Sequence, residues 1–93
     1  MTLKQQVHII VSGRVQGVFF RDFTRKQAIK LGLCGWVKNT DDGKVEIIAE
    51  GEKEKLNQLI EAVKIGSEHA QVKDCQVEWN NLTKEFSNFE IIY

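Results

Sequence analysis

The stretch Val7–Arg21, VHIIVSGRVQGVFFR, runs from an apolar segment through a short loop flanked by glycines to an arginine. In Val7–Val11 both faces of the alternation are largely apolar, which predicts a central strand covered on at least one side. From Arg21 to Leu31 the apolar residues follow helical spacing, and Gly32 occupies the place of a C-terminal cap. The chain is therefore expected to pass from a strand through a tight loop into a helix.

The loop itself has the composition of an anion site. Gly13 and Gly17 permit backbone angles that other residues resist, so successive N–H groups can converge on one point. The helix N-terminus adds a partial positive charge beside that point, and Arg21 adds a permanent planar cation. A cation at a helix start is otherwise unfavourable, and a bound dianion supplies its reason. We expect a small pocket for phosphate.

Past the first helix, Gly35–Thr40 and Lys44–Ala49 are predicted as two strands joined by a hairpin at Asp41–Gly43, since Asp and Gly tolerate positive φ. A second helix should begin near Glu52 and end at Gly66, because apolar residues recur there at i, i+3, i+4 and i+7. These are Leu56, Leu59, Ile60 and Val63.

Two further alternating segments, Val72–Trp79 and Phe89–Tyr93, complete the order β-α-β-β-α-β with an additional C-terminal strand. This order predicts an α+β protein with a ferredoxin-like sandwich: a mainly antiparallel sheet with two helices on one face, in a single domain over residues 1–93. That fold hosts many unrelated functions, so it does not identify the chemistry.

Composition excludes several classes of function. The 93 residues are 42% hydrophobic, enough for one domain that buries roughly 60–65% of its unfolded surface. Thirteen basic residues balance thirteen acidic ones, so the electrostatic footprint of a nucleic-acid binder is missing. No run approaches the ~20 apolar residues that span a bilayer, and no secretory leader opens the chain. We expect a monomer without membrane or nucleic-acid partners.

The metal-ligating residue types give no sign of a cofactor. Cys34 and Cys75 have neither the spacing of a metal site nor a C-x-x-C partner, and no cluster of His, Cys or carboxylates follows metal-ligand spacing. One disulfide between the two cysteines is conceivable but unnecessary at this size. We expect both to be reduced, in a cytoplasmic protein with neither metal nor cofactor.

Two motifs resemble those of the acylphosphatase family. The pattern G-x-V-Q-G-V-x-F-R is matched by Gly13, Val15, Gln16, Gly17, Val18, Phe20 and Arg21. The pattern G-W-V-x-N-x-x-x-G-x-V-x-x-x-x-x-G is matched by Gly35, Trp36, Val37, Asn39, Gly43, Val45 and Gly51. Both occur in the family's order and spacing, and the resemblance covers essentially the whole chain. Glu52, which follows Gly51 at the start of the second expected helix, departs from the proline common in relatives, but it lies away from Arg21 and Asn39 in the sequence.

The resemblance implies that an acyl phosphate is hydrolysed to a carboxylate and inorganic phosphate. Arg21 and Asn39 would be the catalytic residues: Arg21 holds the phosphoryl group, and Asn39 positions water for direct attack, without a covalent intermediate. The backbone N–H groups that would assist Arg21 belong to Arg14, Val15, Gln16, Gly17 and Val18. The sequence leaves the acceptor of the water's proton open, an oxygen of the substrate being one candidate.

Other candidates for chemistry are weaker. His8 lies mid-strand, off the inward-facing register, and neither it nor His69 matches a functional position of the family. The pair Asp41 and Asp42 is better explained as a solvated turn. The aromatic residues that could stack on bases are better explained as core and pocket wall, because the motifs of RNA-recognition domains are missing. They are Phe19, Phe20, Phe23 and Trp36.

Two rival functions remain. A non-catalytic phosphate-sensing module would keep Arg21 and the loop but would not need Asn39. An acylphosphatase-like domain also opens the hydrogenase-maturation carbamoyl transferases, which use carbamoyl phosphate. That alternative would require further domains, and the chain ends at Tyr93.

Overall fold

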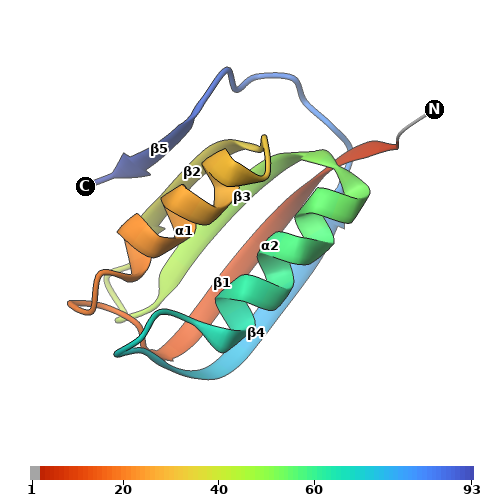
Figure 1. Cartoon of the computed structure of the whole chain (residues 1–93). Helices are drawn as coiled ribbons and strands as arrows, with labels where there is room; N and C mark the ends of the chain where they lie inside the picture. Colours follow the sequence, from red (N-terminus) through yellow and green to blue (C-terminus); the bar gives the residue numbers. More distant parts are fainter. Residues whose placement is uncertain (1–2) are drawn as a thin grey trace.

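Seven elements follow one another along residues 3–93, the part of the chain that this computed structural model describes (Figure 1). They are β1 (Lys4–Arg14), α1 (Phe20–Lys30), β2 (Cys34–Asn39), β3 (Val45–Glu52), α2 (Lys53–Ile65), β4 (Gln71–Asn80) and β5 (Phe89–Ile92). Both helices begin within a residue of their expected starts. The glycines expected to end them do so: Gly32 and Gly66 both have positive φ, 71° and 83°, which glycine adopts without strain.

The five strands form one sheet in the order β4-β1-β3-β2-β5. The pairs β1–β3, β1–β4 and β2–β3 are antiparallel, and only β2–β5 is parallel. The first four strands thus interleave two β-α-β halves, and the C-terminal strand extends the sheet beyond β2. This is the ferredoxin-like α+β fold, as predicted.

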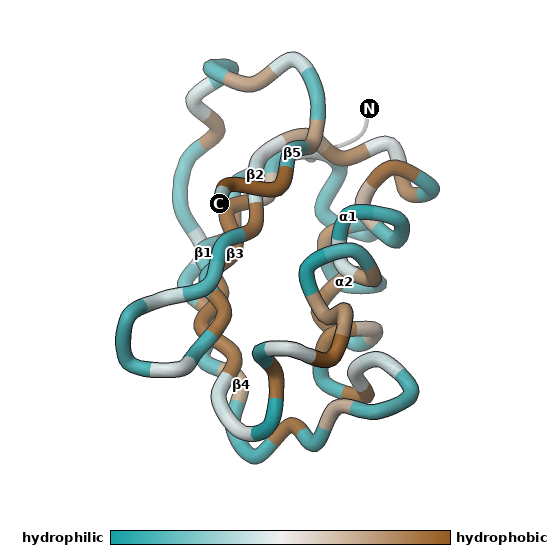
Figure 2. The backbone as a smooth tube through the Cα atoms, turned by 90° about the vertical axis from the view of Figure 1, so that its left-hand side faces the viewer, coloured by the Kyte–Doolittle hydropathy of each residue, from teal (hydrophilic) through white to brown (hydrophobic). Residues whose placement is uncertain are grey.

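Both helices cover the same face of the sheet, so the core is one layer of side chains between helices and strands (Figure 2). The α2 stripe of Leu56, Leu59, Ile60 and Val63 is buried against the sheet. The inward-facing residues of β1 and β3 are fully buried beneath the helices. They are Val7, Ile9, Val11, Val45, Ile47 and Ala49.

The opposite face of the sheet carries no helix, and apart from Glu50 its described residues are partly buried or exposed. His8 and Trp36 lie on this face, level with Ile48 of β3 between them. Trp36 stacks under the Lys38 ammonium group at 5.1 Å from the ring centroid. The expectation that Trp36 belongs to the core or to a pocket wall is therefore wrong, because its neighbour Val37 takes the helix-covered side.

The connection from β4 to β5 is anchored by one buried carboxylate. Glu50 of β3 is 1% exposed, and it accepts hydrogen bonds from Gln6 Nε2 (2.8 Å), Thr83 N (2.9 Å), Thr83 Oγ1 (2.6 Å) and Lys84 N (3.1 Å). Burial tends to raise the pKa of Glu50, but the bonds from Thr83, Gln6 and Lys84 outweigh it and hold the pKa below its ordinary value. The long loop that arches toward β5 in Figure 1 is thus tied to the sheet.

The two cysteines are free and cannot meet within one chain. Cys34 lies on β2 and Cys75 on β4, with β1 and β3 between them. Three strand spacings separate them by about 14 Å, whereas a disulfide requires Cα atoms within about 7 Å. Burial raises the pKa of both thiols. Within residues 3–93 no helix is both long enough and apolar enough to cross a membrane.

Candidate active site

The strand register brings the two predicted catalytic segments to one end of the sheet. Val11 of β1 pairs with Val45 of β3, and Asn39 of β2 pairs with the same Val45 from the other side. The loop that leaves β1 and the turn that leaves β2 therefore lie side by side, as Figure 1 shows at the lower left of the sheet.

The loop between β1 and α1 takes its course from unusual backbone angles. Gly13 has φ 122°, and a Cβ there would collide with the backbone carbonyl of Gln71 on β4, at the point where the β1–β4 register shifts. Gly17 has φ 71° in open space. Phe19 also adopts a left-handed conformation, φ 61°, immediately before α1. A positive φ is uncommon for a residue other than glycine; among such residues in the described chain, only Phe19 and Lys84 adopt one.

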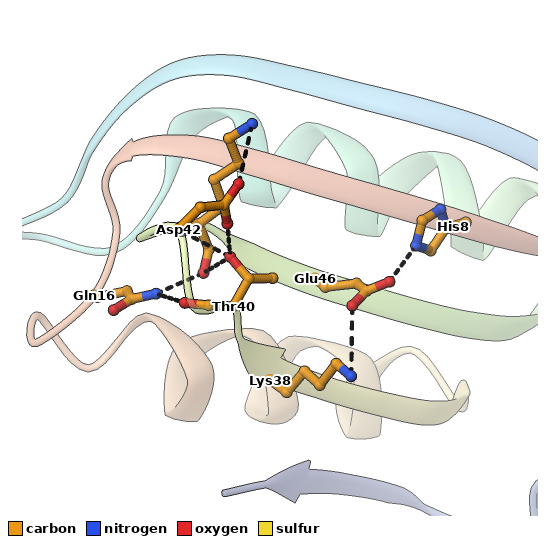
Figure 3. A network of polar contacts seen from close by, with 7 residues as sticks. His8, Gln16, Lys38, Thr40, Asp42 and Glu46 are labelled. Atoms are coloured by element: carbon orange, nitrogen blue, oxygen red, sulfur yellow. Dashed lines mark hydrogen bonds and ion pairs between the residues drawn. The ribbon is translucent and has the colours of Figure 1, made fainter.

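The Gln16 side chain ties this loop to the β2–β3 turn. Its Nε2 donates to the carbonyl oxygens of Thr40 and Lys44, both at 2.8 Å (Figure 3). The turn is closed by Thr40 N donating to Lys44 O at 2.9 Å, and by Lys44 N donating to Thr40 Oγ1 at 3.0 Å. The Gln16 amide thus fixes the distance between the loop and the residue that follows Asn39.

The N–H groups of residues 15–18 are free of backbone partners. None of the backbone hydrogen bonds formed outside the helices and strands of residues 3–93 has one of these N–H groups as its donor. Buried or half-buried N–H groups are rarely left without an acceptor. Together with the start of α1, this loop offers several donors to a ligand that carries negative oxygens.

A cavity of about 250 Å³ opens between the loop, the start of α1 and the ends of β2 and β5. It is lined by Val15, Gly17, Phe19, Phe20, Arg21, Asp22, Asn39, Ile91 and Tyr93. The structure therefore brings Arg21 and Asn39 to one cavity together with part of the loop. Of the other predicted loop residues, Arg14 is exposed at the end of β1 and Val18 is buried.

Arg21 faces this cavity without a carboxylate partner. None of the ion pairs among residues 3–93 involves it. Its nearest described partner is the ring of Tyr93, whose centroid lies 4.9 Å from the guanidinium carbon. A half-buried cation with no counterion leaves its donors available to an anion.

Asn39 ends β2 and lines the same cavity. Among the described residues, the Oδ1 atom of Asn39 is buried and accepts no hydrogen bond. A buried acceptor without a partner costs about 1–3 kcal/mol, so such atoms are normally satisfied by water or by a ligand. The Asn39 amide is thus suited to hold a small donor such as water.

Sequence reasoning missed three residues of the cavity, Asp22, Ile91 and Tyr93. Asp22 pairs with Lys26 one turn along α1, at 3.0 Å. The alternation of the C-terminal segment predicted that Ile91 and Tyr93 share one face, but it did not predict that this segment pairs with β2. Phe19 is a wall of the cavity, as expected, and Phe20 belongs to the core.

The residues set aside at the sequence level lie elsewhere. His8 contacts Glu46 at 2.6 Å on the helix-free face of the sheet (Figure 3). Asp42 accepts from Thr40 Oγ1 in the exposed turn, and this bond is the main reason that the pKa of Asp42 is lowered, with Lys44 assisting. His69 lies in the exposed turn before β4. No group of three or more potential metal ligands occurs within residues 3–93.

The fold and the cavity define a class: a small ferredoxin-like protein with a cavity between the β1–α1 loop and the end of β2. The acylphosphatase family model matches residues 7–91. The chain belongs to the acylphosphatase family, whose members are hydrolases.

Individual acylphosphatases are similar to this chain over nearly its whole length. An acylphosphatase of Pelotomaculum thermopropionicum is 44% identical over 90 residues, which cover 97% of this chain and 98% of the relative. The crystal structure of acylphosphatase from Bacillus subtilis superposes with a TM-score of 0.93 at 48% identity, covering 96% of this chain and 99% of that one. An acylphosphatase structure from Coxiella burnetii gives 0.90 at 39% identity, over 96% and 93% of the two chains.

Proposed function

We propose that this protein hydrolyses acyl phosphates by direct attack of a water molecule held by Asn39. The phosphoryl group is bound by Arg21 and by the backbone N–H groups of residues 14–18. The observation that carries this proposal is that Arg21, Asn39 and part of the loop line one cavity. Among residues 3–93, Arg21 forms no ion pair and the buried Asn39 oxygen has no hydrogen-bond partner.

The leaving group accounts for the small number of reactive side chains. A carboxylate leaves with a conjugate-acid pKa of about 4, so the reaction needs no general acid. The remaining task is to stabilise the charge that spreads over the phosphoryl oxygens in the transition state. A planar guanidinium can hold two of these oxygens at once, and fixed N–H groups can hold the others without reorganising.

Asn39 is suited to hold the attacking water. Its unsatisfied Oδ1 can accept a hydrogen bond from water. A neutral amide does so without repelling the incoming phosphoryl group, whereas a carboxylate at this position would repel it. His8 and His69 lie outside the cavity, and Asp22, the carboxylate in its lining, is paired with Lys26 at 3.0 Å. We therefore infer that the proton is taken by a phosphoryl oxygen of the substrate.

A phosphate-sensing module is the second candidate, because it would use the same loop and arginine. A sensing module would not need the unpartnered oxygen of Asn39, whereas hydrolysis would use this oxygen to hold the attacking water. This difference favours the enzyme.

The decisive experiment removes the arginine. Arg21→Ala should lower kcat/KM for acetyl phosphate at least ~10²–10³-fold, the usual effect of one oxyanion donor, and should weaken the binding of inorganic phosphate. Arg21→Lys should recover little of this activity, because an ammonium group cannot hold two phosphate oxygens at once as a planar guanidinium does. Arg25→Ala, one turn further along α1 and exposed, is the matched control. Full activity of folded Arg21→Ala would exclude this arginine from the reaction.

Substrate range tests the leaving-group argument independently. With no positioned acid, a departing alkoxide cannot be protonated, so glycerol phosphate should react orders of magnitude more slowly than acetyl phosphate. Aryl phosphates should rank by the pKa of the leaving phenol. Activity should also persist in EDTA, since the proposed steps use no cation. Equal rates on acetyl and glycerol phosphate, or complete loss on chelation, would contradict the mechanism.

We also propose that the protein acts in the cytoplasm as a single-domain monomer without metal or cofactor. The proposed steps use Arg21, Asn39 and backbone N–H groups beside one cavity, and none of these steps calls for a residue of a second subunit. The two free thiols suit a reducing compartment. Light scattering at assay concentration should give the mass of one chain, 10.7 kDa, and a dimer mass would refute the monomer.

A further inference from the structure

The last residue of the chain occupies a position that packing does not explain. Tyr93 is 94% exposed, the highest value among the exposed large hydrophobic residues of the described chain. Its ring nevertheless lies against the guanidinium of Arg21, at 4.9 Å between ring centroid and guanidinium carbon. It also lines the cavity that contains Arg21 and Asn39. At 94% exposure, burial of apolar surface contributes little to holding this ring in place, so its contact with Arg21 calls for another reason.

We propose that Tyr93 is a positioning residue, whose ring holds the guanidinium of Arg21 in the orientation that binds the phosphoryl group. This inference rests on the proposed function of Arg21. A cation over an aromatic face is attracted by the ring quadrupole. The five N–H donors of a guanidinium lie in its plane, so an aromatic ring can restrain the group without accepting a hydrogen bond from any of them, and they stay available to phosphate oxygens.

The choice of a ring rather than a carboxylate has a physical consequence. A carboxylate beside Arg21 would hold the guanidinium equally well, but it would occupy the fork and oppose a phosphate dianion. The Tyr93 ring restrains the side chain and leaves its full charge for the substrate. The lack of any ion pair to Arg21 among residues 3–93 agrees with this arrangement.

The parallel pairing of β5 with β2 explains how the ring reaches this place. Gly35 pairs with Phe89, and Lys38 pairs with Ile92. The next residues in register are Asn39 and Tyr93, so the edge strand delivers Tyr93 beside the strand end that carries Asn39. The adjacent Ile92 does not line the cavity and is 41% exposed, which makes it a matched control on the same strand.

Two substitutions separate the ring from the hydroxyl. Tyr93→Phe keeps the aromatic face and should retain the wild-type values. Tyr93→Leu should weaken inorganic phosphate binding and lower kcat/KM, each by roughly two- to fivefold, the range for an exposed cation–π contact. Ile92→Ala should change neither. Because Tyr93 is exposed, the urea midpoint of Tyr93→Leu should equal that of the wild type.

The acyl group of the substrate provides a further discrimination. Arg21 acts on the phosphoryl group that all substrates share, so Tyr93→Leu should lower kcat/KM for acetyl and benzoyl phosphate by the same factor. A loss confined to benzoyl phosphate would mean that the ring contacts the acyl group, and it would overturn the proposal.

NMR supplies a readout that does not depend on turnover. The ring current of Tyr93 should shift the Arg21 side-chain protons upfield in the wild type and in Tyr93→Phe, and this shift should disappear in Tyr93→Leu. Unchanged Arg21 shifts and unchanged phosphate affinity in Tyr93→Leu would refute the positioning role while leaving Arg21 itself untouched. An active Arg21→Ala variant would instead refute the proposed function, so the two failures are distinguishable.

Discussion

At the scale of single residues, two side chains that line the cavity have a charge or a hydrogen-bond acceptor that no other residue of 3–93 pairs with. Arg21 carries a charge that no carboxylate neutralises, and Asn39 carries a buried oxygen that no donor satisfies. Gln16, in contrast, donates its amide N–H groups to the carbonyl oxygens of Thr40 and Lys44 in the turn. Its side chain therefore has a structural role, and the proposed function uses only its backbone N–H.

The division of labour between Arg21 and Asn39 can be tested by separating turnover from binding. Asn39→Ala should lower kcat by at least ~10²-fold, the usual cost of misplacing a reacting group. Inorganic phosphate needs only the loop and Arg21, so its affinity, measured by calorimetry, should stay near the wild-type value. Asn57→Ala, on the exposed side of α2, is the control. Abolished phosphate binding in Asn39→Ala would contradict this division.

At the scale of elements, Glu50 connects the sheet to the segment that completes the site. Its carboxylate holds Thr83 and Lys84, the loop they belong to leads into β5, and β5 carries Ile91 and Tyr93 to the cavity. A buried side chain of β3 thus controls an edge strand at the opposite side of β2.

The Glu50 anchor gives a pH dependence of stability with a definite sign. The folded pKa of Glu50 lies below its ordinary value of 4.5, so the stabilisation is complete above that value and is lost as the pH falls through the folded pKa. Glu50→Gln should cost about 1–3 kcal/mol at pH 7, the range for bonds to a charged group, and should flatten the stability profile below pH 4.5. Urea unfolding across this range is the measurement, and an unchanged profile would refute the anchor.

At the scale of the whole molecule, the protein has one covered and one open sheet face. Ile47 and Ile48 are neighbours on β3 that point to opposite faces: Ile47 is fully buried under the helices, whereas Ile48 is only partly buried beside Trp36. The free energy of unfolding should therefore depend on the two side chains very differently.

Truncation of each isoleucine measures this asymmetry. Ile47→Ala should destabilise the protein by about 2–5 kcal/mol, because it removes buried methyl groups and leaves a cavity. Ile48→Ala should cost less, since solvent reaches its site and a cavity need not persist. Urea unfolding of both variants is the measurement. Equal losses would mean that the open face is covered in solution.

The sequence alone determined the features whose signal is local. Helical spacing and Gly32 located α1, the Asp41–Gly43 turn located the β2–β3 hairpin, and the glycine-flanked loop with Arg21 indicated an anion site. Each depends on residues within one or two turns of chain, so the pattern is complete in the sequence. The two motifs together also indicated the acylphosphatase family, which the comparisons confirmed.

Only the tertiary structure decided which of these local pieces meet. Alternation places Trp36 and Val37 on opposite faces, but the docking of the helices decides that Val37 is the covered one. The ionised Glu50 can be buried only because Thr83, thirty-three residues away, returns to it. Tyr93 reaches Arg21 only because β5 pairs in parallel with β2. Pairings between distant strands follow from the packing of the entire sheet, and no segment of the sequence contains that information by itself.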